Sequence, residues 1–145
     1  MAKFEGSNFE LELPDEALDV SAYCFSFPTL GKMPPNLTIT VQKFDDRPVL
    51  EEFCETRTAL ISESLNNFEI ISEKRNRRGN WDYIVSIVQW TAEDVIVRQK
   101  RIFIYVPEPG HAIYSLVATD LAENAEKSDP TIDDIIRSFK PDEGG

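Results

Sequence analysis

The chain has 145 residues, of which 41% are hydrophobic and 28% are charged, a composition typical of one folded domain with a buried core. Its net charge is −11, which argues against binding to nucleic acid or to anionic membrane surfaces, because both require a basic surface. The first residues, MAKFEG, lack the features of a signal peptide, and no run of about 18 apolar residues is present to span a membrane. We therefore expect one cytoplasmic domain over residues 1–145, with 142–145 as a frayed end.

The two cysteines are consistent with the expected cytoplasmic location. Cys24 and Cys54 are typical of small buried hydrophobic residues in a reducing environment. A disulfide between them remains the alternative.

Alternating patterns predict three strands in the first third of the chain. Phe9, Leu11 and Leu13 alternate with glutamates, and residues 37–42 alternate Leu, Ile and Val with Thr and Gln. Between them, residues 21–27 form a predicted strand whose two faces differ in size. One face carries large aromatic side chains and the other small ones, namely Tyr23, Phe25 and Phe27 against Ala22, Cys24 and Ser26.

The remaining chain predicts a helix, four strands and a second helix. Asp45-Asp46-Arg47-Pro48 is a helix-start signal, and apolar residues recur at helical spacing from Val49 to about Leu65. The four predicted strands cover residues 68–74, 83–90, 95–106 and 112–119, with a turn over 75–80. The second helix is expected to start at Asp129-Pro130 and to stop at Pro141. This order predicts an α+β fold, with a mostly antiparallel sheet and helices on one side of it.

The strands over 83–90 and 95–106 form the clearest hairpin. With Ala92-Glu93 as its tip, Val88 faces Val97, and Ser86 faces Gln99. Both faces of the hairpin carry apolar residues. We expect one face to pack under the helices, and the other to be an exposed binding patch or to be buried in a dimer.

Few groups suited to catalysis are present. The only histidine, His111, follows a Pro-Gly turn and is expected at a strand edge, and no zinc-site spacing or Gly-rich phosphate loop occurs. The acidic pairs Asp45-Asp46 and Asp133-Asp134 lie near predicted helix starts, where the helix dipole favours carboxylates. The basic cluster at residues 74–78 is interpreted as a solvated loop or as a patch for an acidic partner. We therefore expect a protein without enzymatic activity, cofactor or metal.

Several segments resemble one known family. They are FELELPDEALDVSAYCFSFP, PNLTITVQ, ESLNNFEIISE, VQW, VRQKRIF and DDIIRSFKP, spread from about Phe9 to Pro141. Together they resemble the DcrB-like domain family and, more narrowly, the Eag chaperones of bacterial type VI secretion. The resemblance rests on spacing and hydrophobic pattern rather than on one invariant motif. It implies a PsbP-like fold, a single domain with a curved antiparallel sheet backed by helices.

The resemblance also implies a function. Eag chaperones of this kind are cytoplasmic homodimers without enzymatic activity. They shield the N-terminal transmembrane helices of a secreted effector until it is loaded onto the secretion spike. They hold these helices in an apolar groove on the sheet, with polar side chains that mimic the hydrogen bonds between membrane helices. Carried over to this chain, the groove positions of the second strand fall on Ala22 and Cys24, where the family often has larger aliphatic residues, and the polar glutamine falls on Gln99.

We therefore expect five residues to bind an effector helix: Ala22, Cys24, Ser86, Val88 and Gln99. Small side chains on the second strand would let an apolar helix approach closely. The alternative is that a bulky side chain of the protein's own helix packs over them. Two other functions remain open, a small-ligand-binding module or enzyme with a cavity between sheet and helix, and a structural PsbP-like subunit of a larger complex.

Overall fold

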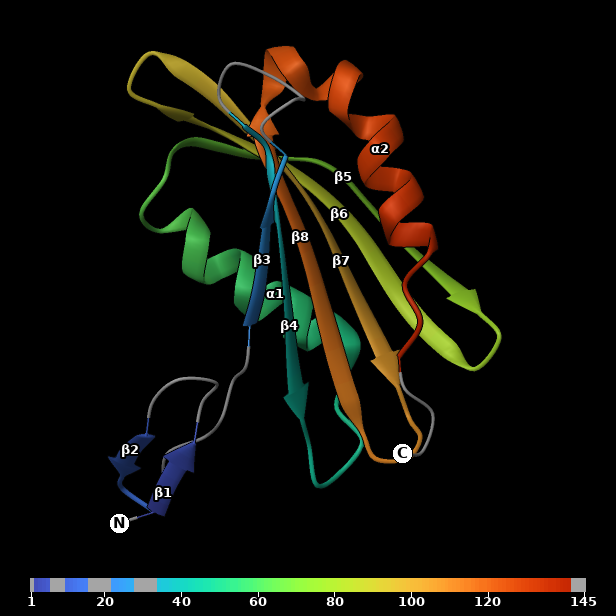
Figure 1. The fold of residues 1–145 in the computed structure, drawn as a ribbon. Helices are drawn as coiled ribbons and strands as arrows, with labels where there is room; N and C mark the ends of the chain where they lie inside the picture. The colour runs from blue at the N-terminus through green and yellow to red at the C-terminus, as the bar shows by residue number, and fades with distance from the viewer. Residues whose placement is uncertain (1, 6–9, 16–21, 28–33, 142–145) are drawn as a thin grey trace.

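The fold is built on one large antiparallel sheet. The structure is a computed structural model that describes residues 2–5, 10–15, 22–27 and 34–141. Six strands form the main sheet in the order β3-β4-β8-β7-β6-β5, and β1 pairs with β2 in a separate small sheet (Figure 1). The strands are β1 (Ala2–Glu5), β2 (Glu10–Leu13), β3 (Ala22–Ser26), β4 (Asn36–Lys43), β5 (Asn66–Arg78), β6 (Trp81–Ala92), β7 (Val95–Val106) and β8 (Ala112–Leu121). The helices are α1 (Leu50–Ser62) and α2 (Ala125–Arg137), with the short 3-10 turn η2 (Ala122–Asn124) before α2.

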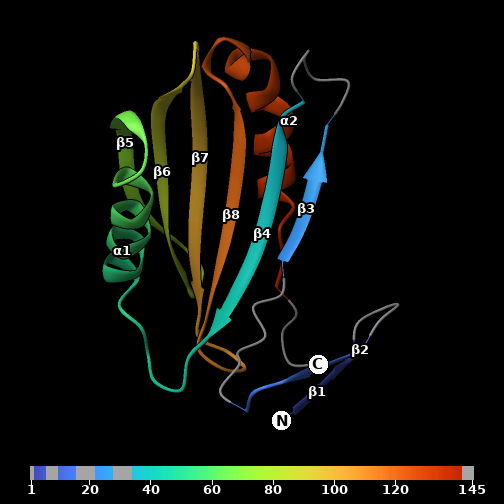
Figure 2. The same ribbon diagram turned by 90° about the vertical axis from the view of Figure 1, so that its left-hand side faces the viewer.

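The prediction of an α+β domain with a curved antiparallel sheet backed by helices is confirmed. The expectation that both helices share one side is wrong. Figure 2 shows the sheet between the two helices, with α1 on one face and α2 on the other. Each helix therefore packs on its own apolar set of strand residues.

The core under α1 joins the start of that helix to the middle of the sheet. Leu50 and Cys54 of α1 pack on Ile84, Phe103 and Ile113, and all five side chains are buried. Phe53 meets the ring of Phe103 edge to face, with their centroids 5.8 Å apart. These contacts fix α1 over β6 and β7.

The core under α2 uses the alternate residues of the same strands. Ile132 of α2 is buried against Ile102, Ile104 and Leu116. Phe139, just after α2, meets Tyr114 edge to face with a centroid separation of 5.2 Å. The apolar residues that the sequence places on both faces of the hairpin are thus explained, because each face receives a helix.

The hairpin register differs from the predicted one by two residues. The loop is Glu93-Asp94, with Glu93 at a φ of 54°, so that Val88 pairs with Gln99 and Ser86 with Arg101. A shift of two residues preserves the side of the sheet on which each residue lies, because side chains alternate with period two. The predicted faces of Ser86, Val88 and Gln99 are therefore correct although their partners are not.

Two predicted boundaries are also corrected. Strand β5 continues through the basic residues 74–78, which were expected to form a turn, and the turn is only Gly79-Asn80. Charged side chains suit β5 because it is an edge strand, where they oppose pairing with other chains. Helix α2 starts at Ala125, ahead of Pro130. The carboxylate of Asp120 holds this start by accepting a hydrogen bond from Ser128 Oγ at 2.5 Å.

Candidate helix-binding surface

The face of the sheet that carries α1 is only partly covered by it. Because α1 lies over β6 and β7, the strands β8, β4 and β3 continue beyond the helix on the same face. Their register places Cys24 beside Thr38 and Thr38 beside Val117. The neighbouring rows join Ala22 to Thr40 and Ser115, and Ser26 to Asn36 and Thr119.

Small uncharged side chains fill this uncovered region, which we call the small-residue shelf. Its members are Ala22, Cys24, Ser26, Thr38, Thr40, Ser115, Val117 and Thr119. None is charged, although charged residues make up 28% of the chain. The β3 members are exposed, whereas most of the others are half-buried. Small residues and hydroxyls of this kind also dominate contacts between helices in membranes, since they allow backbones to approach closely.

The shelf has the width of one helix. Neighbouring strands lie about 4.8 Å apart, so β8, β4 and β3 span roughly 10 Å from the first to the third. An α-helix with its side chains is about 10–12 Å across. A single helix therefore fits between α1 and the free edge of β3.

One side of α1 forms a wall beyond the shelf, at the end of β4 that carries Gln42. An open groove of about 820 Å³ lies there, lined in part by Gln42, Phe53, Arg57 and Leu60. Arg57 Nη2 donates a hydrogen bond to Gln42 Oε1 at 3.2 Å, and its guanidinium lies over the ring of Phe53. Leu60 is 62% exposed, which leaves an apolar side chain on this wall. The groove thus combines apolar and aromatic surface with charged side chains, namely Asp45, Asp46, Arg47, Glu52 and Arg57, and it begins at Gln42, two residues beyond the shelf residue Thr40.

The inner edge of the shelf carries the predicted glutamine. Gln99 on β7 is half-buried, and its Nε2 donates a hydrogen bond to Thr119 Oγ1 at 3.1 Å. A side-chain amide carries two donor hydrogens and an acceptor oxygen, so one bond to Thr119 leaves it able to pair with a polar group of a bound chain. Gln99 can therefore contribute polar contacts where the shelf meets the covered part of the sheet.

A buried arginine lies next to the shelf. Arg101 is 2% exposed, and its Nη2 donates hydrogen bonds to Thr58 Oγ1 at 2.6 Å and to Ser86 Oγ at 2.8 Å. Burial lowers the pKa of the Arg101 guanidinium, and burial likewise raises the pKa of the neighbouring Cys54 thiol. Arg101 thus connects α1 to the sheet from within.

The five expected binding residues share one face but differ in accessibility. Ala22 and Cys24 are exposed on the shelf, and Gln99 lies at its inner edge. Ser86 and Val88 are each 0% exposed under α1. Neither can touch a chain that lies on the shelf while α1 stays in place, so both belong to the core in this structure. Cys24 and Cys54 are free thiols, one exposed and one buried.

Sequence reasoning missed the β4 and β8 parts of the shelf. Thr38 and Thr40 alternate with Ile39 and Val41, which is the same alternation that marks Ala22, Cys24 and Ser26, whereas Val117 and Asp120 interrupt it in β8. That signal is present in the sequence. What assigns it to one surface is the pairing of β4 with both β3 and β8, strands that lie far apart along the chain.

Comparisons of the sequence with protein families and with curated proteins give no match. No protein-family profile matches the chain, and no curated protein matches it. Across the described residues, neither helix has the length and hydrophobicity needed to cross a bilayer.

Solved structures similar to this one include the following three. A Pseudomonas aeruginosa protein of unknown function, PA94, described as a putative regulator, is 15% identical with a TM-score of 0.73, covering 98% of this chain and 97% of that one. LpqN of Mycobacterium tuberculosis, described as involved in cell envelope biogenesis, is 12% identical with a TM-score of 0.54, covering 72% and 58%. Cyanobacterial PsbP (CyanoP) from Synechocystis is 10% identical with a TM-score of 0.56, covering 90% and 98%. The chain therefore has a PsbP-like fold.

Proposed function

We propose that this protein is a cytoplasmic chaperone that binds and shields the N-terminal apolar helices of a type VI secretion effector before the effector is loaded onto the spike. The observation that carries the proposal is the small-residue shelf, an uncharged surface one helix wide on a protein whose net charge is −11. The client and the secretion system are implied by the resemblance of the sequence to the Eag chaperones. The same resemblance implies that the protein acts as a homodimer and without enzymatic chemistry.

The physical chemistry of a transmembrane helix in water supports such a role. A helix that spans a bilayer carries about 20 predominantly apolar residues. Removing this surface from water stabilises a complex by about 25 cal/mol per Å² of apolar area. The threonine and serine hydroxyls of the shelf, together with Gln99, offer hydrogen bonds to the occasional polar group of such a helix.

Co-expression tests the proposal. The protein is co-produced with tagged N-terminal segments of effectors encoded beside its gene, and with a soluble amphipathic helix of equal length as the control. We expect the apolar segments to become soluble and to co-purify with the protein, because the shelf replaces the bilayer as their partner. The control helix should not co-purify. If no apolar segment gains solubility or co-purifies, the chaperone role is wrong.

A further inference from the structure

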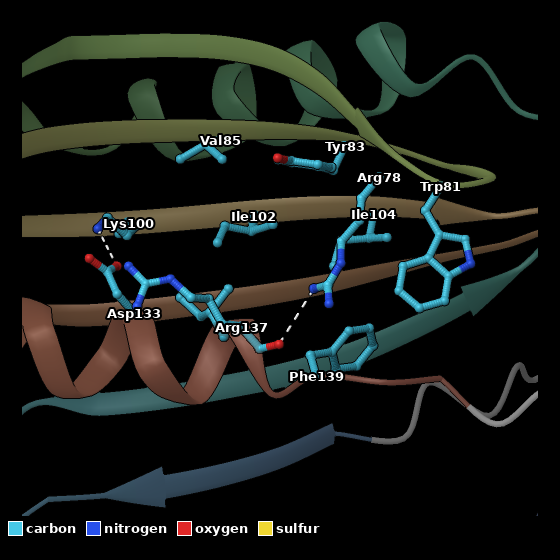
Figure 3. Close-up of a pocket in the computed structure, with 11 residues that line it drawn as sticks. Arg78, Trp81, Tyr83, Val85, Lys100, Ile102, Ile104, Asp133, Arg137 and Phe139 are labelled. Carbon is cyan, nitrogen blue, oxygen red and sulfur yellow. Dashed lines mark hydrogen bonds and ion pairs between the residues drawn. The ribbon is translucent and has the colours of Figure 1, made fainter.

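A second hollow lies on the opposite face of the sheet, away from the small-residue shelf. It is a cavity of about 250 Å³ between the end of α2 and the strands β6 and β7 (Figure 3). Its floor is apolar and partly aromatic, with Trp81 and Tyr83 from β6, Ile102 and Ile104 from β7, and Phe139 closing it after α2. Concave apolar sites with a few convergent polar groups are the usual form of small-ligand sites.

The rim of this cavity is cationic, although the protein is acidic overall. Lys100 Nζ is neutralised by Asp133 Oδ1 at 2.6 Å, and Arg137 Nη1 by Asp134 Oδ1 at 3.0 Å. Arg78 differs from both of them. Its Nη1 donates to the backbone carbonyl of Arg137 at 3.4 Å, and within the described part of the chain it forms no ion pair with a carboxylate.

From this arrangement we infer that the cavity binds a small amphipathic carboxylate. The apolar chain lies on the floor formed by Tyr83, Ile102 and Ile104, and the carboxylate pairs with the guanidinium of Arg78. A guanidinium presents parallel N–H donors that match the two oxygens of a carboxylate, and such charge-assisted bonds are the strong ones. Because the guanidinium of Arg78 has no carboxylate partner among the described residues, it favours an amphipathic carboxylate over a neutral alcohol of the same length.

The size of the cavity limits the ligand. Pockets for drug-sized molecules usually measure about 300–1,000 Å³, so a cavity of about 250 Å³ suits a ligand of roughly a dozen non-hydrogen atoms. A medium-chain fatty acid such as decanoate fits this limit. The site is independent of the proposed chaperone role, because it lies on the α2 face while the shelf lies on the α1 face.

Decanoate and the uncharged alcohol decanol serve as matched probes. Trp81 lines the cavity, whereas Trp90 pairs with Val97 on the other face, so a Trp90→Phe background leaves one tryptophan as the fluorescence reporter. We expect saturable binding of decanoate by fluorescence and by calorimetry. Arg78→Gln should weaken decanoate at least about tenfold, since it removes a charge-assisted contact, and should leave decanol binding unchanged.

Arg77→Gln is the control for the change of charge. Arg77 is the neighbouring residue on the same strand, lies beside Asp82 on the α1 face, and should leave decanoate binding unaltered. Equal weakening by the two variants would show a general charge effect and would overturn the proposal. So would decanol binding as tightly as decanoate, or the absence of saturable binding. Vesicles of phosphatidylglycerol present a lipid anion on a surface, and Arg78-dependent binding to vesicles without binding of free decanoate would also contradict the proposal.

Discussion

Cys24→Glu should abolish the capture of an apolar client helix and leave the protein folded. Cys24 is exposed on β3, the outermost strand of the small-residue shelf, beside Thr38, so a glutamate there needs no rearrangement of the core. A bound apolar helix would bury this carboxylate without a partner, which is a severe cost for a charged group. Co-purification with an effector segment should fall to background, while the thermal unfolding midpoint of the variant stays close to that of the unsubstituted protein.

The matched control is Tyr23→Glu. Tyr23 is the adjacent residue of the same strand, is 65% exposed, and points to the opposite face of the sheet. It receives the same new charge on the same edge strand, so any general effect of charge or of edge disruption appears in both variants. Capture that survives Cys24→Glu, or is lost equally in Tyr23→Glu, places the client somewhere other than the shelf. Unfolding of Cys24→Glu would show instead that Cys24 belongs to the core.

Arg101→Ala should lower the free energy of unfolding by about 2–4 kcal/mol. The substitution removes a long buried side chain and leaves the hydroxyls of Ser86 and Thr58 without the guanidinium that donates to them. Urea unfolding monitored by circular dichroism measures the change.

Arg101→Met is the informative companion variant. It keeps most of the buried volume and removes a charge that forms no ion pair with any described carboxylate, while the Nε of Arg101 is itself buried without a hydrogen-bond partner. Methionine retains the packing but, like alanine, leaves the buried hydroxyl of Ser86 without its donor, so we expect a loss of about 1–2 kcal/mol, smaller than that of Arg101→Ala. If Arg101→Met lowers the free energy of unfolding as much as Arg101→Ala does, the hydrogen bonds of Arg101 rather than its packing stabilise the contact between α1 and the sheet.

The order of the elements could be predicted because each long element has a clear period. The register and the faces required more than local pattern. Both faces of the β6–β7 hairpin are apolar because α1 and α2 pack on opposite sides, and no local signal distinguishes that arrangement from an exposed patch or a dimer surface. The hairpin face on which a client helix was expected is therefore covered by α1, and the opposite face is covered by α2. Only the small-residue shelf extends beyond α1 on the expected face.

The predicted end of β5 and the predicted start of α2 are wrong because basic residues also indicate a turn and a proline also indicates a helix start. Residues 74–78 resemble a turn by composition, yet they complete an edge strand whose side chains reach water on both faces. Pro130 resembles a helix start, yet it is the sixth residue of α2 and is exposed. The backbone carbonyl that loses its intrahelical partner there can be hydrated, which reduces the penalty of an interior proline.

The face of the expected binding residues could be predicted, but their accessibility could not. Ala22, Cys24 and Gln99 lie on the shelf or at its edge, because alternation assigns faces correctly even when the register is shifted. Ser86 and Val88 share that face but lie under α1, and their burial depends on where one helix docks, which the strand pattern does not encode.

Photo-crosslinking from Cys24 shows whether the small-residue shelf holds the client helix. Cys24 is an exposed free thiol and Cys54 is buried, with its pKa raised by burial, so a maleimide photo-crosslinker should label Cys24 alone in the folded protein. The comparison protein carries Cys24→Ser and Tyr23→Cys, which moves the same label to the opposite face of β3. With a co-purified effector segment, we expect crosslinks to its apolar helix from position 24 and none from position 23. Crosslinks from position 23 alone, or from neither position in a complex that co-purifies, would contradict this expectation.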